Sequence, residues 1–412
     1  MVTVCILLAL CGSLQARKKK GPAGPPPHSV TVPAVIDHGR VILSAEISLP
    51  GGSTQTIRAW VDNGNPDLRL SRRVATLLGL KVSCDDKECS APPPEGITIG
   101  GMTIPLGDVK QAKIPLRAVN AAAVLALGMK AEINLPSSVL RHYDVLIDFS
   151  ERKVTIGTPG SIHFNGVSAK VQIDPETGVI SVPSKIENKK YDLELDLGQS
   201  LSFLSADLFD TLAAAHPNWP HITGAVGPAD EWGNDLVKQK VMRLDRLQFG
   251  PLFLVDVAVG DWTKDKMDFP GEVAALAGSG RLGSQALQNY RVGIDYAHSM
   301  VYFDIGRLAT LPDFDVVGLI LRPDENGEYT ILGVADFEGK PSVDGVQAGD
   351  RLIAVNDIAV AGATMGQVWS ILGGTPGQER KLTLERSGKQ FDVMAPVRHF
   401  LGDAPDDTHG KE

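Results

Sequence analysis

Two short motifs built on aspartate and glycine carry the strongest chemical signal in the chain. Residues 61–64 read Val-Asp-Asn-Gly and residues 195–198 read Leu-Asp-Leu-Gly, each at the end of an apolar run. Two carboxyl groups within hydrogen-bonding distance cannot both ionise, so they share one proton. The ionised carboxylate activates a water as general base, and the protonated one polarises a peptide carbonyl. The motifs therefore predict Asp62 and Asp196 as an acid–base pair.

The two motifs lie in a duplicated frame. After each of them an apolar residue and a serine, Leu70-Ser71 and Leu204-Ser205, open a short helical stretch. Further along, residues 135–156 and 282–303 match at one constant spacing. The matched pairs are Leu140/Leu287, Tyr143/Tyr290, Val145/Val292, Ile147/Ile294, Asp148/Asp295 and Val154/Val301. A single Asp-x-Gly marks many ordinary turns, but two copies in one repeated order of elements indicate a duplicated lobe.

The elements that must position these residues are mainly β-strands. Short apolar runs alternate with Gly, Pro and Asn turns from Val30 onward, which predicts many short strands. Helices are expected at Ser71–Leu78, Ala206–Ala215 and Gly366–Leu372. We expect a signal peptide (1–16), a Pro-rich linker (17–32), a first lobe (33–160), a second lobe (161–308), a third unit (314–398) and a disordered tail (399–412).

At these residues the chain resembles the pepsin–retropepsin clan of aspartic proteases, over the span from Pro33 to Arg307. The family motif is apolar-Asp-Thr/Ser-Gly, followed later by an apolar-Gly pair and an apolar-Asp-Tyr strand. The resemblance implies a mainly β, bilobal fold, with Asp62 and Asp196 as the catalytic dyad of an endopeptidase (a hydrolase) that needs no cofactor. It also implies polypeptide substrates and a glycine-rich loop near the cleft at 224–227. The residues expected to support the dyad are Gly64, Gly198 and Asn63.

The chain departs from the family pattern beside both aspartates. Where the family has a hydroxyl that braces the dyad, this chain has Asn63, which can still donate a hydrogen bond, and Leu197, which cannot. The first copy also reads Leu135-Pro136 where the second keeps Leu282-Gly283. Two functions therefore stay open: a working aspartic peptidase, and a catalytically inactive protease-like scaffold that binds peptides.

The third unit resembles a PDZ domain, on the run Gly345–Asn356 with its Ala-Gly-Asp-Arg-Leu pattern. The resemblance implies a loop at Val317–Leu321 whose backbone N–H groups capture a C-terminal peptide carboxylate, while the peptide adds as a strand. It implies recruitment of a substrate or partner, and the alternative is a module that only packs on the lobes. Thr364 is expected to cap the helix beside the groove. The expected peptide-binding residues are Gly318, Leu319, Ile320, Leu321, Val368 and Leu372.

A second glycine motif, Gly278-Ser-Gly-Arg-Leu-Gly283, fits the G-x-G-x-x-G spacing of dinucleotide sites. Such a site needs a strand, this loop and a long helix within one βαβ unit. In this chain only a short segment separates the motif from the repeated strand Val292–Tyr296. We therefore interpret the motif as the apolar-Gly turn of the second lobe.

The N-terminal residues and the cysteines bear on the compartment. Residues 1–16 are apolar and end in small residues, which is the length of a signal peptide, although basic residues come after the apolar run and none precedes it. We expect export to a periplasmic or extracellular location, with an uncleaved leader as a possible anchor and no membrane span in the mature chain. Cys84 and Cys89 are then expected to form a disulfide, since a lone pair is a poor metal site. Two unpaired thiols are the alternative, and no metal site is expected.

Composition excludes one further class of function. The chain has 412 residues, too many for one hydrophobic core, with 43% hydrophobic and 22% charged residues, as in ordinary soluble proteins. Its net charge of −9 argues against nucleic-acid binding, because contacts to phosphates need a concentrated basic face.

Overall fold

The structure of the protein is a computed structural model that describes residues 28–85, 89–114, 128–223, 227–228, 240–262, 279–307, 314–324 and 326–402. Most elements are strands, and the helices are few and short, which confirms the mainly β class. No helix among these residues is long and apolar enough to cross a membrane.

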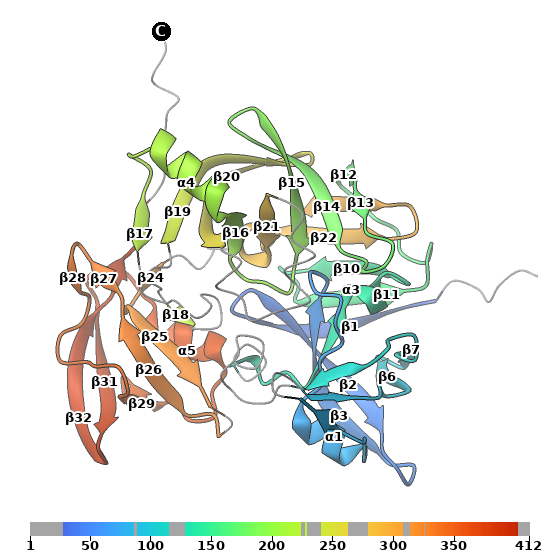
Figure 1. The fold of residues 1–412 in the computed structure, drawn as a ribbon, viewed down its shortest axis with the longest axis horizontal. Helices are drawn as coiled ribbons and strands as arrows, with labels where there is room; N and C mark the ends of the chain where they lie inside the picture. Colours follow the sequence, from blue (N-terminus) through green and yellow to red (C-terminus); the bar gives the residue numbers. More distant parts are fainter. Residues whose placement is uncertain are drawn as a thin grey trace, which may run out of the picture.

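A six-strand run in the largest sheet joins the two lobes, in the order β12-β23-β22-β10-β11-β1 (Figure 1). Its strands are β1 (Ser29–Asp37), β10 (Asp144–Asp148), β11 (Lys153–Gly157), β12 (Val167–Lys170), β22 (Tyr290–Asp295) and β23 (Met300–Ile305). β10 and β22 are antiparallel and pair Leu146 with Gly293, which are equivalent residues of the repeat. The register is therefore symmetric about this pair, so a pseudo-twofold axis passes between the two copies.

Beside this sheet, each lobe has its own strands, and the pairing around the motif aspartate is the same in both. The first has β2 (Arg40–Ser48), β3 (Thr54–Asp62), β6 (Gly96–Ile99), β7 (Met102–Pro105) and β9 (Ile133–Pro136). The second has β13 (Gln172–Ile173), β14 (Ile180–Ile186), β15 (Lys189–Asp196), β16 (Ser202–Ser205), β17 (His221–Thr223), β19 (Lys240–Phe249), β20 (Leu252–Trp262) and β21 (Gly280–Gly283). β3 runs parallel to β9, and β15 runs parallel to β21. In both copies, the strand that ends in the motif aspartate thus pairs with a strand from much later in the chain.

Short helices lie at matched positions of the repeat. They are α1 (Arg72–Leu77), α3 (Ser137–Leu140), α4 (Ala206–Ala215) and a 3-10 helix at Ser284–Leu287. The Ser71 hydroxyl accepts from the N–H of Val74 and so satisfies one unpaired donor at the start of α1. α1 and α4 lie where the sequence predicts helices.

The disulfide between Cys84 and Cys89 is present, with an S–S distance of 2.04 Å. The two cysteines face each other across β4 (Ser83–Cys84) and β5 (Cys89–Ala91), and β8 (Ala112–Ile114) completes this small sheet. The bond ties the strand after α1 to the core of the first lobe, where Cys89 is fully buried.

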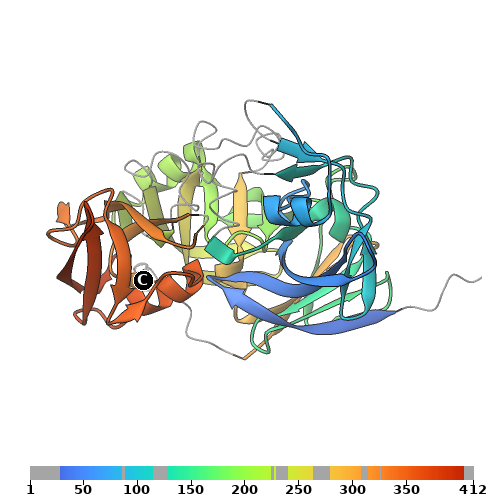
Figure 2. The same cartoon turned by 90° about the horizontal axis from the view of Figure 1, so that it is seen from below.

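The third unit is a sheet packed with one helix, at the orange end of the molecule in Figure 2. Its main path is β18-β25-β26-β29-β31-β32. The elements are β18 (Gly227–Pro228), β24 (Asp315–Val316), β25 (Leu319–Pro323), β26 (Tyr329–Val334), β27 (Asp336–Phe337), β28 (Lys340–Pro341), β29 (Arg351–Val355), β30 (Ile358–Ala359), α5 (Met365–Leu372), β31 (Glu379–Arg386), β32 (Lys389–Pro396) and β33 (Arg398–His399). Thr364 caps α5 in a capping box with Gln367, as the sequence predicts.

The third unit is fastened to both lobes. Its apolar core continues into the second lobe through Phe203 and Trp262. On the first lobe, the Asp37 carboxylate accepts the N–H of Gly366 at 2.9 Å, at the start of α5. The module is therefore a packed part of the molecule, whatever it binds.

Asp350, in the Ala-Gly-Asp-Arg run, holds the third unit's sheet together. Its buried carboxylate accepts two hydrogen bonds from Arg386 of β31, at 2.7 and 2.8 Å, and one from the N–H of Gln347. The hydrogen bond from Arg386 is the main reason that the pKa of Asp350 lies below its ordinary value. The run that carries the PDZ resemblance thus has a structural role.

This interaction predicts a pH-dependent stability. A lowered pKa in the folded state stabilises the protein above the unfolded carboxyl pKa of about 3.9, and the effect is lost as the pH falls through the folded value. Asp350→Asn should therefore lower the midpoint of urea unfolding at pH 7, and the difference from the wild type should shrink below about pH 4. The exposed Asp357→Asn is the matched control and should show little change at either pH. An equal deficit at pH 7 and pH 3 would contradict the expectation.

Candidate active site

Asp62 and Asp196 occupy the same place in the two lobes. Asp62 ends β3 and pairs with Pro136, and Asp196 ends β15 and pairs with Gly283. Both aspartates are 3% exposed. Pro136 of the first lobe therefore takes the place of Gly283 of the second, and the strand pairing that positions the aspartate is the same.

The glycine of each motif lies against the aspartate of the other lobe. A Cβ atom added to Gly64 would lie 2.1 Å from the carboxyl carbon of Asp196, and one added to Gly198 would lie 2.4 Å from Oδ1 of Asp62. Real Cβ atoms do not approach so closely, so only glycine fits at these two positions. The two motifs thus interlock across the pseudo-twofold axis, and the structure brings the two predicted aspartates to one interface.

Asn63 braces this interface from the first lobe alone. Its Nδ2 donates to the carbonyl oxygen of Leu195, and its Oδ1 accepts the N–H of Leu197, both at 2.7 Å. The sequence suggested that the bracing was degraded in both lobes. One amide side chain instead makes two crosslinks, while the Leu197 side chain is fully buried in the apolar core and contributes packing.

Two side-chain donors that the sequence did not predict each hold one carboxylate oxygen of an aspartate. Nδ2 of Asn134 donates to Oδ2 of Asp62, and Nη1 of Arg281 donates to Oδ2 of Asp196, each at 2.8 Å. The other oxygen of Asp196 accepts the N–H groups of Gly198 and Gln199 at 3.0 Å. Arg281 could have been singled out from the sequence, because it is a charged residue in the otherwise apolar run Gly280–Gly283 and directly precedes Leu282, the counterpart of Leu135 in the repeat.

The two glycine-rich segments of the sequence, 224–227 and 278–283, are described by the structure only in part. Residues 224–226 of the expected cleft loop lie outside the described residues, and Gly227–Pro228 form β18, which pairs with β25 of the third unit. Gly280–Gly283 form β21, and a four-residue 3-10 helix comes next, before β22. A dinucleotide site needs a long helix at that place, so Gly280–Gly283 of the motif are a strand of the second lobe.

The predicted peptide-binding residues of the third unit lie together but are buried. Leu319, Ile320, Leu321, Val368 and Leu372 are each at most 5% exposed. A Cβ on Gly318 would lie 2.3 Å from the Phe400 ring, which explains the glycine. The backbone of β25 pairs in parallel with β18, at Ile320/Gly227 and Leu321/Pro228, so this sheet edge already carries a strand of the same chain.

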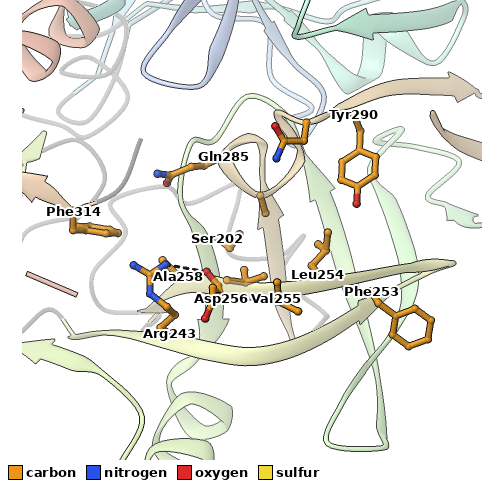
Figure 3. A pocket seen from close by; sticks show the side chains of 13 residues that line it. Ser202, Arg243, Phe253, Leu254, Val255, Asp256, Ala258, Gln285, Tyr290 and Phe314 are labelled. Carbon is orange, nitrogen blue, oxygen red and sulfur yellow. Dashed lines mark hydrogen bonds between the residues drawn. The ribbon is translucent and has the colours of Figure 1, made fainter. Parts of the chain in front are cut away.

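A cavity of about 310 Å³ lies on the second lobe, and its lining includes neither Asp62 nor Asp196 (Figure 3). Arg243 of β19 and the exposed Phe253 of β20 line it from opposite sides. The guanidinium donates to the backbone carbonyls of Asp256, Leu401 and Gly402, at 2.7 to 2.9 Å. These contacts tie the residues after β33, which the sequence analysis assigned to the disordered tail, to the second lobe, where Leu401 is fully buried.

Solved structures of low sequence identity resemble parts of this chain. No protein-family model matches it, and no curated protein sequence matches it. Among solved structures, an aspartic proteinase from Irpex lacteus is similar, with a TM-score of 0.40 and 11% identity over 69% of this chain and 99% of that one. A photosystem II D1 C-terminal processing protease has a TM-score of 0.18 and 20% identity over 21% of this chain and 23% of that one. At these TM-scores neither likeness bears on function, which has to be inferred from the geometry of the two aspartates.

Proposed function

We propose that the protein is an aspartic-type endopeptidase acting on polypeptides. The observation that supports this most is the interlocking of the two motifs, in which each glycine lies on the opposite aspartate. Such an interface places the two aspartates on opposite sides of one pseudo-twofold axis, and two carboxyls that approach within hydrogen-bonding distance there would share a proton and activate a water. The N–H of Gly198 on Asp196 and the two Asn63 crosslinks support the proposal, because they hold the two motifs in place relative to each other.

The test is cleavage of an unstructured polypeptide by the purified protein from acidic to neutral pH. Mass spectrometry should detect internal cleavage, and a transition-state analogue inhibitor of aspartic proteases should abolish it. Absence of products at every pH, together with retained binding of the polypeptide, would favour the catalytically inactive peptide-binding scaffold. The Arg281 contact on Asp196 is the observation that favours this alternative, because a buried guanidinium already occupies one oxygen of a carboxylate that would have to take part in the reaction.

We propose further that the third unit is a PDZ-type module that recruits substrates or partners by their C-termini. Strand addition along β25, next to α5, is the mode by which such modules bind peptides. The pairing of β18 with β25 is consistent with an edge that accepts a strand, and a bound peptide would have to displace β18. The N–H of Leu319 donates to the carbonyl oxygen of Val317 at 2.8 Å, so a captured carboxylate would also compete with this bond.

A fluorescent peptide assay on the full chain tests this recruitment. A binder selected from a random C-terminal library should lose at least about tenfold in affinity when its carboxyl group is amidated, since a charge-assisted hydrogen bond is lost. The control is the same peptide with a conservative change outside its last four residues. Equal binding of the acid and the amide, or no binder from the library, would favour a module that only packs on the lobes.

We also propose that the protein works outside the cytosol. The Cys84–Cys89 disulfide supports this, because disulfides persist in oxidising compartments, and so does the apolar stretch 1–16. In the unreduced, denatured mature protein, thiol titration should find neither Cys84 nor Cys89 free.

A further inference from the structure

A cavity of about 580 Å³ lies on the second lobe, beside β12 at the end of the largest sheet (Figure 1). β12 continues through Val171 into β13, and the pairing with β14 begins only in β13. The cavity is lined by β12, by the β14–β15 hairpin and by the turn between β19 and β20. Neither Asp62 nor Asp196 belongs to this lining. We call the cavity the lysine groove, after the lysines in its walls, Lys170, Lys185 and Lys190.

The lysines give this groove a net positive charge. Lys185 and Lys190 stand directly opposite each other in β14 and β15, and all three lysines are exposed. The described residues include no hydrogen-bond or ion-pair partner for their side chains. Asp192 is the acid of the lining, so three lysines and one aspartate give +2, against −9 for the whole chain. Like charges directly opposite each other destabilise a pair of strands, so the groove favours an anion.

The backbone edge of β12 faces the same groove. Among the described residues, β12 pairs with β23 alone. Val171 donates to the carbonyl oxygen of Ser299 across this pair at 3.0 Å, and the hydrogen-bonded positions alternate along antiparallel strands. The N–H and C=O groups of Ser168 and Lys170 therefore point away from β23, and both residues line the groove. An open strand edge of this kind accepts an extended polypeptide as an added strand.

The positive charge belongs to the second lobe and not to the fold. In the first lobe, β1, β2 and β3 pair as β12–β15 do in the second, so the strand pairings give the equivalent positions. The counterparts of Lys170, Lys185, Lys190 and Asp192 are Pro33, Glu46, Thr56 and Arg58. The first lobe thus has one charge of each sign at these places. Strand packing alone does not require the lysines, since the same strands form without them.

We propose that the lysine groove binds an acidic polypeptide segment in an extended conformation. The segment adds as a strand along β12, where its backbone pairs with Ser168 and Lys170. Successive side chains of a strand alternate between two faces, so acidic residues at every second position would meet the lysines together. The lysines alone would suit any anion, but the open edge of β12 is satisfied by amide groups, which favours a polypeptide over phosphate. This binding site does not rest on the proposed peptidase function.

The probe is a peptide of four Thr-Glu repeats with a neutral fluorophore. Its ends are acetylated and amidated, so it offers no C-terminal carboxylate to the third unit. Fluorescence anisotropy with the full chain should show saturable binding at about 0.15 M NaCl and weaker binding at about 0.5 M, because salt screens exposed charges. The matching Thr-Gln peptide should bind at least about tenfold more weakly. The Asp62→Asn variant should bind the Thr-Glu peptide like the wild type, which separates this result from any cleavage.

Variants of the lysines test the charges. Lys170→Gln, Lys185→Gln and Lys190→Gln should each weaken binding about two- to fivefold, and the triple variant at least about tenfold, since single exposed charge pairs contribute little. The matched control is Lys189→Gln, because Lys189 precedes Lys190 in β15 but does not line the groove. It should bind like the wild type. Melting temperatures should not fall in Lys185→Gln or Lys190→Gln, because each change removes a like-charge pair.

Two further changes test the strand edge. Lys170→Pro introduces the residue that the first lobe has at this place, and it should bind at least about threefold more weakly than Lys170→Gln, because it also removes the outward N–H. Thr-Glu peptides N-methylated at every threonine or at every glutamate need no change in the protein. One of the two should lose at least about tenfold in affinity, since one set of N–H groups faces β12.

Several results would overturn the proposal. Absence of saturable binding, or equal binding of the Thr-Glu and Thr-Gln peptides, would show that the groove does not recognise acidic segments. A loss in Lys189→Gln as large as in Lys190→Gln would show a diffuse charge effect. Full binding of both N-methylated peptides, with displacement by inorganic phosphate, would show an anion site in which β12 accepts no strand.

Discussion

Replacing either Asp62 or Asp196 by asparagine should lower the cleavage rate of an unstructured polypeptide by about 10²–10⁴-fold, the usual range for losing general acid–base catalysis. Asparagine keeps the size of the side chain but can neither share nor shuttle the proton. The double variant should lose little more than either single variant, because the pair acts as one unit. Initial rates measured by mass spectrometry at the optimum pH of the wild type would give these ratios.

Asp210→Asn provides the matched control, because that carboxyl is 58% exposed and pairs with Lys240 on the surface. It should cleave at the wild-type rate. Asn variants at Asp62 and Asp196 that both keep full activity would show that the proteolysis has another source. Multiplicative losses in the double variant would show that the two carboxyls act independently.

Adding one methyl group at the interface between the two motifs should lower the cleavage rate nearly as much as replacing an aspartate. In Gly64→Ala or Gly198→Ala, the new Cβ would overlap the opposite aspartate, at 2.1 or 2.4 Å. Relief requires the two motifs to move apart, and overpacking of this kind costs about 1–3 kcal/mol of stability. A displacement near 1 Å in a catalytic pair lowers the rate by about 10²-fold. Both the melting temperature and kcat should therefore fall.

Gly107→Ala is the control for this pair, because nothing lies within 4 Å of a Cβ at that turn. It should leave the melting temperature and kcat close to those of the wild type. If Gly64→Ala or Gly198→Ala melted and cleaved like Gly107→Ala, the interlocked geometry of the two motifs would be wrong.

The pairing of Asp62 with Asp196 could be predicted from the sequence, because each aspartate and the glycine that packs against its counterpart lie in one contiguous motif. An apolar strand followed by an aspartate and a glycine is a local sequence pattern. A single copy also occurs in ordinary turns, but two copies in a duplicated order of elements distinguish this pattern from them. The helices at α1 and α4 were predicted for a similar reason, since each begins beside a serine and continues as an amphipathic stretch.

The charge of Arg281 stands out in its apolar run, but the contacts that Asn134 and Arg281 make with the aspartates could not be predicted, because they depend on pairings between distant strands. Asn134 and Arg281 reach the aspartates only when β9 and β21 lie parallel to β3 and β15, and no local pattern encodes that register. The replacement of a hydroxyl by Asn63 was seen in the sequence, but its two crosslinks depend on how closely the lobes approach. Similarly, the pairing of β18 with β25 joins segments whose spacing carries no signal.

Asn134 and Arg281 occupy equivalent positions of the two lobes, and each donates to the aspartate of its own lobe. This difference in side chain at equivalent positions has a consequence for the origin of the site. In a dimer of identical single-lobed chains, two-fold symmetry places the same side chain at both copies of every position. An amide on one side and a guanidinium on the other would be impossible there. In a single chain that contains both lobes, the two copies can acquire different side chains. If a sequence change made the lobes identical again, both aspartates would have the same hydrogen-bond donor.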